Sequence, residues 1–333
     1  MTAQTILRRC DNAKLNALEI KARKTVLYSY PSNIQISPTE NCNLSCFHCY
    51  RHKWKDTLYA EDMDARLLDI ESVRQAASCA QNAWLVSGGE SFLYKDFAKI
   101  IRFLNKSEVD DIFMITNGTV YDEEIIDTLA TGARAHIKVS MEGATTATVN
   151  DIKGAPVYEK ILNFLRRHSL CDRLRPYLAI SMVLMKQNYH ELPQLMTLAS
   201  ELGIPKVEAH HCQPLNDEVL NMGLYDMPEE YNRLIRQARR ESKRLGVELW
   251  TPPLFRRSSA APIITPCRQP WTFFLINQIG DVYPCCHLWG HKFGNVFRDS
   301  FDGIWNGPLM RKLRSDIAEM GYSGYAWAPP AQN

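Results

Sequence analysis

Three cysteines within eight residues, Cys42, Cys46 and Cys49, have the clearest chemical potential in this 333-residue chain. Their spacing, Cys-x3-Cys-x2-Cys, places three thiolates on one short segment, and thiolates hold both iron–sulfur clusters and zinc. A [4Fe–4S] cubane held by three cysteines keeps one iron without a protein ligand, and such an open position can bind and activate a molecule. The alternative is a structural zinc site in which His48 is the fourth ligand.

A second group of cysteines lies toward the C-terminal end. Cys267 precedes an apolar run, and Cys285 and Cys286 are adjacent after Pro284. Adjacent cysteines beside a proline turn are hard to explain by packing. Ten cysteines in a chain without a signal peptide also favour metal ligands or reactive thiols over disulfides. We therefore predict a second metal site here, whereas Cys212, after two histidines, stands apart from both groups.

Three further segments have the composition of a ligand-binding site: Ser87-Gly88-Gly89-Glu90, Thr116-Asn117-Gly118 and Ser140-Met141-Glu142-Gly143. Glycine lets a backbone approach a ligand closely, and a carboxylate suits an ammonium group. The alternative is that these polar residues only cap the ends of strands.

The elements that position these residues follow from hydrophobic periodicity. Between residues 33 and 211, short β-like runs alternate with amphipathic stretches. The predicted strands are Asn33–Ser37, Ala83–Ser87, Asp111–Thr116, His136–Met141, Leu178–Met185 and Lys206–His211. The predicted helices lie near 64–79, 95–106, 122–131, 157–168 and 190–202, and a basic one follows near 228–246. Six right-handed βαβ units are too few to close an eight-stranded TIM barrel. We therefore predict an α/β fold, a partial (β/α)6 TIM-like barrel.

Ligands of such sheets bind at the carboxyl ends of the strands. The first cysteine group and the three polar segments each lie at the end of one of the first four predicted strands, and Cys212 follows the sixth. The motifs therefore converge on one edge of the predicted sheet.

The first cysteine segment resembles the signature of the radical SAM superfamily, with His48 in the slot that usually holds an aromatic residue. The resemblance extends over roughly residues 33–212 and includes the glycine–glycine–glutamate motif. It implies that Cys42, Cys46 and Cys49 hold a [4Fe–4S] cluster that binds S-adenosylmethionine (SAM). It also implies SAM contacts from His48, Gly88, Gly89, Glu90, Asn117, Ser140 and Glu142. In this superfamily, an electron donor such as flavodoxin or ferredoxin reduces the cluster, SAM is cleaved, and the 5′-deoxyadenosyl radical abstracts a substrate hydrogen.

The C-terminal segment resembles the start of a SPASM or twitch domain, a small α+β domain that binds auxiliary [4Fe–4S] clusters. It carries a predicted hairpin, Trp271–Ile276 and Val282–Cys286, but the later cysteines of a full domain are missing. Three interpretations stay open: an auxiliary cluster on Cys267, Cys285 and Cys286 with His287, His291 or substrate as fourth ligand; a shortened tail that has lost ligands; or a cluster-free cap.

Cys212 also admits three interpretations. It could return a hydrogen atom to a substrate radical, as cysteines do in radical SAM epimerases, ligate an auxiliary cluster, or simply line the pocket as a small residue.

The whole chain divides, by these patterns, into an N-terminal extension (1–32), the radical SAM barrel (33–250), a linker (251–264) and the twitch/SPASM-like domain (265–333). A formal charge of +2 gives no reason to expect nucleic acid or membrane as a partner, and no apolar run is long enough for a membrane span. We expect a cytoplasmic protein.

We expect an enzyme that dehydrogenates or epimerises a sugar- or aminocyclitol-like small molecule in natural-product (antibiotic) biosynthesis. Its basis is the single reduced auxiliary site and an N-terminal extension too short for a leader-peptide-binding domain. One alternative is a maturase that modifies a ribosomally made peptide; another is a non-enzymatic zinc-binding protein.

Overall fold

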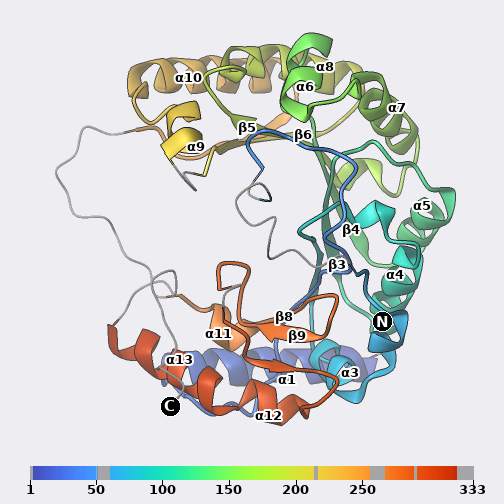
Figure 1. Cartoon of the computed structure of the whole chain (residues 1–333), viewed down its shortest axis with the longest axis vertical. Coiled ribbons are helices and arrows are strands. Elements are labelled where there is room, and N and C mark those ends of the chain that lie inside the picture. The colour runs from blue at the N-terminus through green and yellow to red at the C-terminus, as the bar shows by residue number, and fades with distance from the viewer. Residues whose placement is uncertain are drawn as a thin grey trace. The chain divides into compact units, whose positions relative to one another are not determined.

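The computed structural model describes residues 3–49, 51, 61–213, 217–255, 267–288 and 291–320. The chain forms two compact units that alternate along the sequence (Figure 1). The first unit comprises residues 1–40, 59–113 and 260–333, and the second comprises residues 41–58 and 114–259. Strand β3 (Asp111–Thr116) begins in the first unit and ends in the second.

The second unit contains a parallel sheet with the order β4-β5-β6-β7. Its strands are β4 (Arg134–Ser140), β5 (Leu178–Leu184), β6 (Lys206–His211) and β7 (Glu248–Trp250). Its helices are α5 (Glu123–Ala130), α6 (Thr146–Lys153), α7 (Tyr158–Ser169), α8 (Leu192–Glu201), α9 (Asp217–Met222) and α10 (Pro228–Leu245), with 3-10 turns η4 (Arg175–Tyr177) and η5 (Tyr189–Glu191). Figure 1 shows α7, α8 and α10 on one side of these strands, so the sheet buries one face against helices.

Helix α10 shows why these segments fold as they do. Its buried residues, Tyr231, Leu234, Ile235 and Ala238, recur at three- and four-residue spacing and form one apolar stripe. Pro228 occupies the first turn, where its missing N–H costs nothing, and Gly246 ends the helix in the left-handed conformation (φ 68°). The predicted helix near 228–246 is therefore confirmed.

The first unit contains the strand order β10-β9-β8-β1-β2, in which β1 is parallel to both neighbours and β8, β9 and β10 are antiparallel. The strands are β1 (Asn33–Ile36), β2 (Asn82–Leu85), β8 (Phe273–Ile276), β9 (Asp281–Tyr283) and β10 (Gly294–Asn295). The helices are α1 (Ala3–Lys21), α3 (Glu71–Ala77), α4 (Phe97–Lys106), α11 (Gln269–Thr272), α12 (Phe301–Trp305) and α13 (Pro308–Met320), with 3-10 turns η2 (Ala65–Asp69) and η3 (Ser91–Leu93).

The N-terminal extension of the sequence is a helix that packs on the C-terminal segment within this unit. Asn16 Nδ2 donates to the Trp271 carbonyl at 2.7 Å, and Trp271 Nε1 donates to the Lys24 carbonyl at 2.8 Å. Trp305 Nε1 likewise donates to the Ser29 carbonyl at 2.8 Å. These bonds join residues more than 200 positions apart, so both chain ends contribute to one core. In the described part of the chain, no helix is long and apolar enough to cross a membrane.

Candidate functional site

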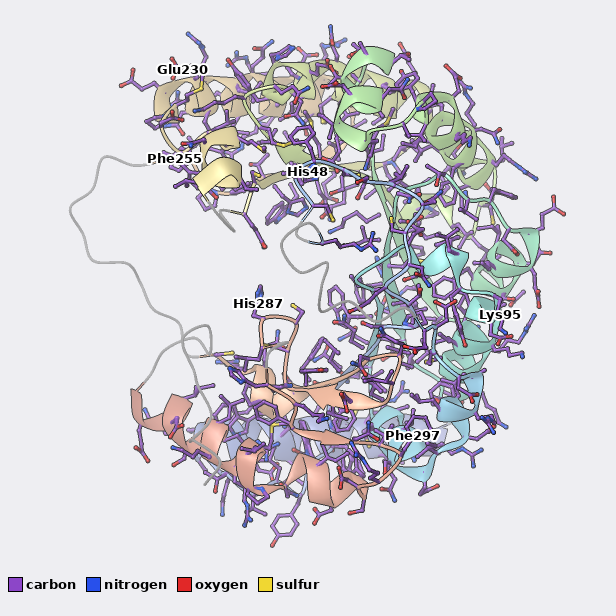
Figure 2. The ribbon with its side chains drawn as sticks, in the orientation of Figure 1. His48, Lys95, Glu230, Phe255, His287 and Phe297 are labelled. Carbon is purple, nitrogen blue, oxygen red and sulfur yellow. The ribbon has the colours of Figure 1, made fainter. Side chains whose placement is uncertain are left out.

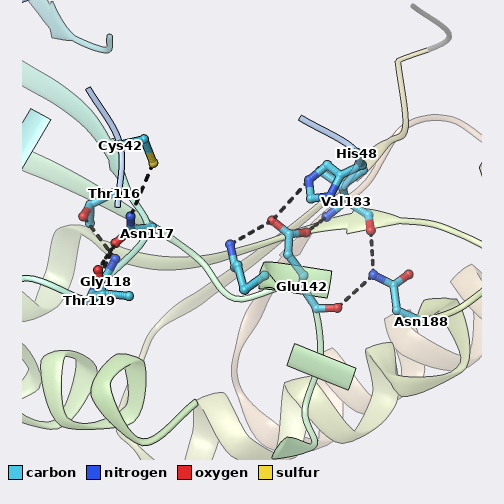
Figure 3. A network of polar contacts seen from close by, with 10 residues as sticks. Cys42, His48, Thr116, Asn117, Gly118, Thr119, Glu142, Val183 and Asn188 are labelled. Atoms are coloured by element: carbon cyan, nitrogen blue, oxygen red, sulfur yellow. Dashed lines mark hydrogen bonds and ion pairs between the residues drawn. The ribbon is translucent and has the colours of Figure 1, made fainter. Parts of the chain in front are cut away.

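The loop with Cys42, Cys46 and Cys49 follows β1 in the sequence and is tied to the end of β3. Asn117 Nδ2 donates to Asn43 Oδ1 at 2.9 Å and lies 4.0 Å from Cys42 Sγ (Figure 3). The Cys49 N–H donates to the Cys46 carbonyl at 3.0 Å, so the last two cysteines share a tight turn. The loop is therefore tied to the end of β3 beside Cys42, and a turn of its own closes it between Cys46 and Cys49.

The three thiols fit a metal cluster in their chemistry. None of them forms a disulfide, and all are partly buried. Burial raises the pKa of Cys46 to about 11 and also raises the pKa of Cys49. A coordinated cation reverses such a shift, because a thiol that binds metal is deprotonated. Among the described residues, no three His, Cys, Asp or Glu side chains converge as they would around a single ion. Thiolates on separate irons of a cubane lie farther apart than the ligands of one zinc ion.

Glu142 is the centre of a second polar group in this unit (Figure 3). It adopts a left-handed backbone conformation (φ 68°), which is uncommon for a residue with a side chain and marks a constrained position. Its Oε2 accepts the Val183 N–H at 2.7 Å, and its Oε1 lies 3.5 Å from Lys153 Nζ and 3.9 Å from His48 Nε2. Two predicted SAM contacts, His48 and Glu142, are thus brought together.

The loop after β4, which carries Glu142, is fixed by two buried side chains. Asn188 Nδ2 donates to the Glu142 carbonyl at 2.8 Å and to the Val183 carbonyl at 2.9 Å. Glu191 accepts the Ala144 and Thr145 N–H groups at 2.6 and 3.0 Å. Although burial raises the pKa of Glu191, these bonds and those from the threonine hydroxyls lower it overall. Ser140, the last residue of β4, pairs in register with Ser181 of β5.

Gly88, Gly89 and Glu90 lie in the first unit, after β2. The Gly89 N–H donates to the Thr39 carbonyl at 3.3 Å. Glu90 is 3% exposed, and its carboxylate accepts the Phe92 N–H at 3.2 Å as the cap of η3. Glu90 therefore caps the 3-10 turn η3, which is the alternative role considered from the sequence. Its contact with SAM stays a prediction.

Cys212 is buried among apolar side chains. It is 2% exposed, in a cluster with Ile152, Met185 and Val219, against which Phe47 packs. Its thiol lies 3.8 Å from the Val219 carbonyl, and burial raises its pKa. The structure thus packs Cys212 in an apolar cluster, and its three interpretations stay predictions.

The second cysteine group lies in the first unit. Cys285 is buried and Cys286 exposed, in the turn after β9, and Cys267 is half-buried before α11. Burial raises the pKa of Cys285 to about 11, and the nearby thiols of Cys286 and Cys267 add to this rise. Figure 2 shows His287, one proposed fourth ligand, at the end of the loop that follows β9. The segment where a second cysteine pair is expected, 321–333, lies outside the described residues.

Lys153, Asn43, Asn188 and Glu191 are site residues that the motifs did not identify. Lys153 is 2% exposed although it ends helix α6 directly before Gly154, where lysine is ordinarily solvated. Only the fold reveals that its ammonium group turns inward.

The chain is similar to known protein families, to individual proteins and to solved structures. The family model described as the radical SAM superfamily matches residues 36–199, and the SPASM iron–sulfur cluster-binding domain matches residues 267–324. An AdoMet-dependent heme synthase from Methanosarcina barkeri is 25% identical over 315 residues, covering 86% of this chain and 85% of that protein. A PqqA peptide cyclase from Xanthomonas campestris is 26% identical over 312 residues, covering 90% and 77%. The crystal structure of Streptococcus suis SuiB bound to S-adenosylmethionine has the same fold (TM-score 0.69, 18% identity, 92% of this chain and 72% of that one).

These similarities confirm the predicted fold class, a TIM-like α/β barrel with a C-terminal SPASM-like region. They also confirm the predicted cofactors, a [4Fe–4S] cluster with SAM and an auxiliary iron–sulfur centre. The chain therefore belongs to the radical SAM superfamily and carries an iron–sulfur cluster-binding domain of the SPASM type.

Proposed function

We propose that this radical SAM enzyme modifies a ribosomally made peptide. The observation that carries the proposal is the similarity to a PqqA peptide cyclase, which extends over 90% of this chain. This favours the maturase, the alternative from the sequence, over the sugar-like substrate.

The residues of this chain have distinct roles in the proposed reaction. Cys42, Cys46 and Cys49 would hold the SAM-binding cluster, and Cys267, Cys285 and Cys286 would hold the auxiliary one. When bound, the cluster and SAM supply the one-electron chemistry that breaks an unactivated C–H bond.

The protein's own contribution is positioning. Ser140 and Glu142 would bind the ribose hydroxyls of SAM, and Gly88, Gly89 and Glu90 its methionyl amino group. Asn188 and Glu191 fix the loop that presents Glu142. Asn117 holds the cysteine loop through Asn43. A flavodoxin- or ferredoxin-like protein is the proposed electron donor.

The test is turnover of short peptides encoded next to the gene. The enzyme is reconstituted anaerobically with iron, sulfide and SAM, and both 5′-deoxyadenosine and the peptide mass are followed. We expect a mass change in one peptide that depends on SAM and on Cys42, Cys46 and Cys49. A parallel reaction contains a tetrapyrrole, since one relative is a heme synthase, and another contains aminocyclitols. Consumption of either with no change in any peptide would overturn the proposal.

A further inference from the structure

The C-terminal end of helix α6 lies against the loop that carries the first cysteine group. A Cβ atom at Gly154, which ends the helix in the left-handed conformation (φ 68°), would lie 3.2 Å from the Ser45 carbonyl oxygen. Two residues earlier, Ile152 belongs to the buried apolar cluster against which Phe47 packs. All of these residues belong to the second unit. The end of the helix therefore contacts the residues on both sides of Cys46.

Lys153, the last residue of α6, places a buried cation at this contact. It is 2% exposed, and its Nζ lies 3.5 Å from Glu142 Oε1. This distance is longer than the roughly 2.7–3.2 Å of an ordinary N–H···O hydrogen bond. Glu142 also accepts the Val183 N–H at 2.7 Å, so its carboxylate is shared (Figure 3). A buried ammonium group with a long ion pair is costly unless further negative charge lies close to it.

The charge of Lys153 acts on two of the three thiols. Burial raises the pKa of Cys46 to about 11, and the Lys153 ammonium opposes that rise more strongly than the Glu142 carboxylate adds to it. Burial also raises the pKa of Cys49, and here Lys153 and Arg51 both act in the lowering direction. Arg51 is partly exposed, whereas Lys153 is buried and is therefore screened less by salt. At Cys46 the Lys153–Glu142 pair thus acts as a net positive charge.

A positive charge beside these thiolates has a direct consequence for an iron–sulfur cluster. A [4Fe–4S] cluster on three thiolates is negatively charged overall, and reduction adds one more negative charge. Net charge, burial and hydrogen bonds to the sulfur atoms set the reduction potential of such clusters. A fixed cation stabilises the reduced state, and it does so more strongly in a site of low dielectric constant than in water. The cluster would in turn supply the negative charge that compensates the buried Lys153.

We propose that Lys153 raises the reduction potential of the cluster on Cys42, Cys46 and Cys49, and that Glu142 limits this rise. The inference rests on the assignment of these three cysteines to the SAM-binding cluster, and it does not depend on which substrate the enzyme modifies. The electron that reduces the cluster comes from the flavodoxin- or ferredoxin-like donor. Lys153 keeps its proton and forms no covalent bond, so its contribution is electrostatic.

The test is a redox titration of the anaerobically reconstituted holoenzyme, followed by electron paramagnetic resonance in the absence of SAM. The SAM-binding cluster is identified as the signal that changes when SAM is added to a separate sample. The wild type is compared with Lys153→Met, Lys153→Arg, Glu142→Gln and Lys186→Met. Lys186 provides the matched control, because it also pairs with a carboxylate of the second unit, that of Asp226, but is exposed.

The measured quantity is the ratio of reduced to oxidised cluster at the potential where half of the wild-type cluster is reduced. In Lys153→Met this ratio should be at least about tenfold lower, which corresponds to a midpoint potential about 59 mV more negative for a one-electron couple. Lys153→Arg and Lys186→Met should match the wild type. Glu142→Gln should shift the ratio in the opposite direction. A purely structural role would not produce opposite shifts, because Lys153→Met and Glu142→Gln break the same ion pair.

An unchanged ratio in Lys153→Met, or shifts in the same direction for Lys153→Met and Glu142→Gln, overturns the inference. Iron content reports whether each variant holds its clusters. If Lys153→Met loses iron, Glu142→Gln decides, and a potential at or below that of the wild type then overturns the inference. If no wild-type signal responds to SAM, the cluster assignment fails and the inference fails with it. None of these outcomes bears on the peptide substrate, which the turnover of peptides tests separately.

Discussion

The buried ion pair between Lys153 and Glu142 gives the most exacting test of the second unit's structure. The two side chains are 3% and 4% exposed, and Nζ lies 3.5 Å from Oε1. Removing one partner of a buried pair costs about 3–5 kcal/mol, because the other charge stays buried without compensation. In Lys153→Met, Glu142 keeps the Val183 N–H at 2.7 Å and His48 at 3.9 Å, so we expect the lower end, about 3 kcal/mol.

Thermal unfolding measures this loss. For a unit of roughly 150–250 residues, 1 kcal/mol lowers the Tm by about 2–4 °C, so Lys153→Met should lower it by roughly 10 °C. The control is Lys186→Met, which removes an exposed pair with Asp226 in the same unit. That pair should contribute at most about 1 kcal/mol. Calorimetry and circular dichroism on the iron-free and reconstituted proteins give the two Tm values.

A double-mutant cycle separates the pair from other effects of the substitution. Glu142→Gln leaves Lys153 without its acidic partner, and the double variant leaves neither charge. The double variant should therefore lose about 2 kcal/mol less than the sum of the two single losses. A Tm for Lys153→Met within about 2 °C of the wild type, or single losses that simply add, would refute the structural reasoning.

Three other predictions follow from the described residues. Replacing Cys42, Cys46 and Cys49 by Ala should remove about four irons per chain after anaerobic reconstitution; unchanged iron in a chemical assay contradicts the cluster assignment. Cys212→Ala should still form 5′-deoxyadenosine and modified peptide, because the thiol is buried against the Val219 carbonyl; loss of product with 5′-deoxyadenosine retained would instead establish hydrogen donation. Burial lowers the pKa of His168 to about 4. The unfolded chain therefore binds the proton first, and stability should fall by about 3 kcal/mol as pH drops from roughly 6.5 to 4. His168→Leu should flatten that part of the Tm profile, and an unchanged slope refutes the assignment.

Most strands and helices were predictable because their signals are local. The six predicted strands from Asn33 to His211 correspond to β1–β6, and the hairpin after residue 270 corresponds to β8 and β9. Alternation and three- to four-residue spacing are properties of a single segment and need no knowledge of its partners. Strand β7 was missed, since three residues directly after a long helix are too few for a periodic signal.

Long-range pairing was not predictable for the same reason. Strand β8 lies parallel to β1, more than 200 residues away in sequence, and no local pattern specifies this neighbour. Residues 1–32 were predicted only as an extension before the first strand, without partners in the fold. In the structure Asn12, Asn16 and Glu19 are buried, and their side chains bond to the loop at residues 28–30 and to Trp271. Buried polar groups that find partners elsewhere in the chain look the same in sequence as exposed ones.

The residues of the candidate site also differ in whether a local sequence pattern could identify them. The cysteine spacing and the Ser140–Glu142 segment resemble motifs of a known superfamily, and this resemblance singled them out. Lys153 carries none, because a lysine at a helix end is ordinarily solvated and favourable there.

The face of the second unit's sheet that carries Lys138, Lys206, Glu208 and His210 is a case where the sequence did contain a signal. Parallel strands covered on both faces are nearly continuous apolar runs, and β5, with only Ser181 as a polar residue, follows that rule. Strand β6 departs from it: Lys206, Glu208 and His210 alternate with Val207 and Ala209. Alternation inside a parallel sheet means that one face meets helices and the other meets something polar. Since β4 places Lys138 on that same face, the polar residues are a shared surface rather than an isolated exception. The period of β6 thus indicates a polar environment for this face of the sheet, independently of any cysteine motif.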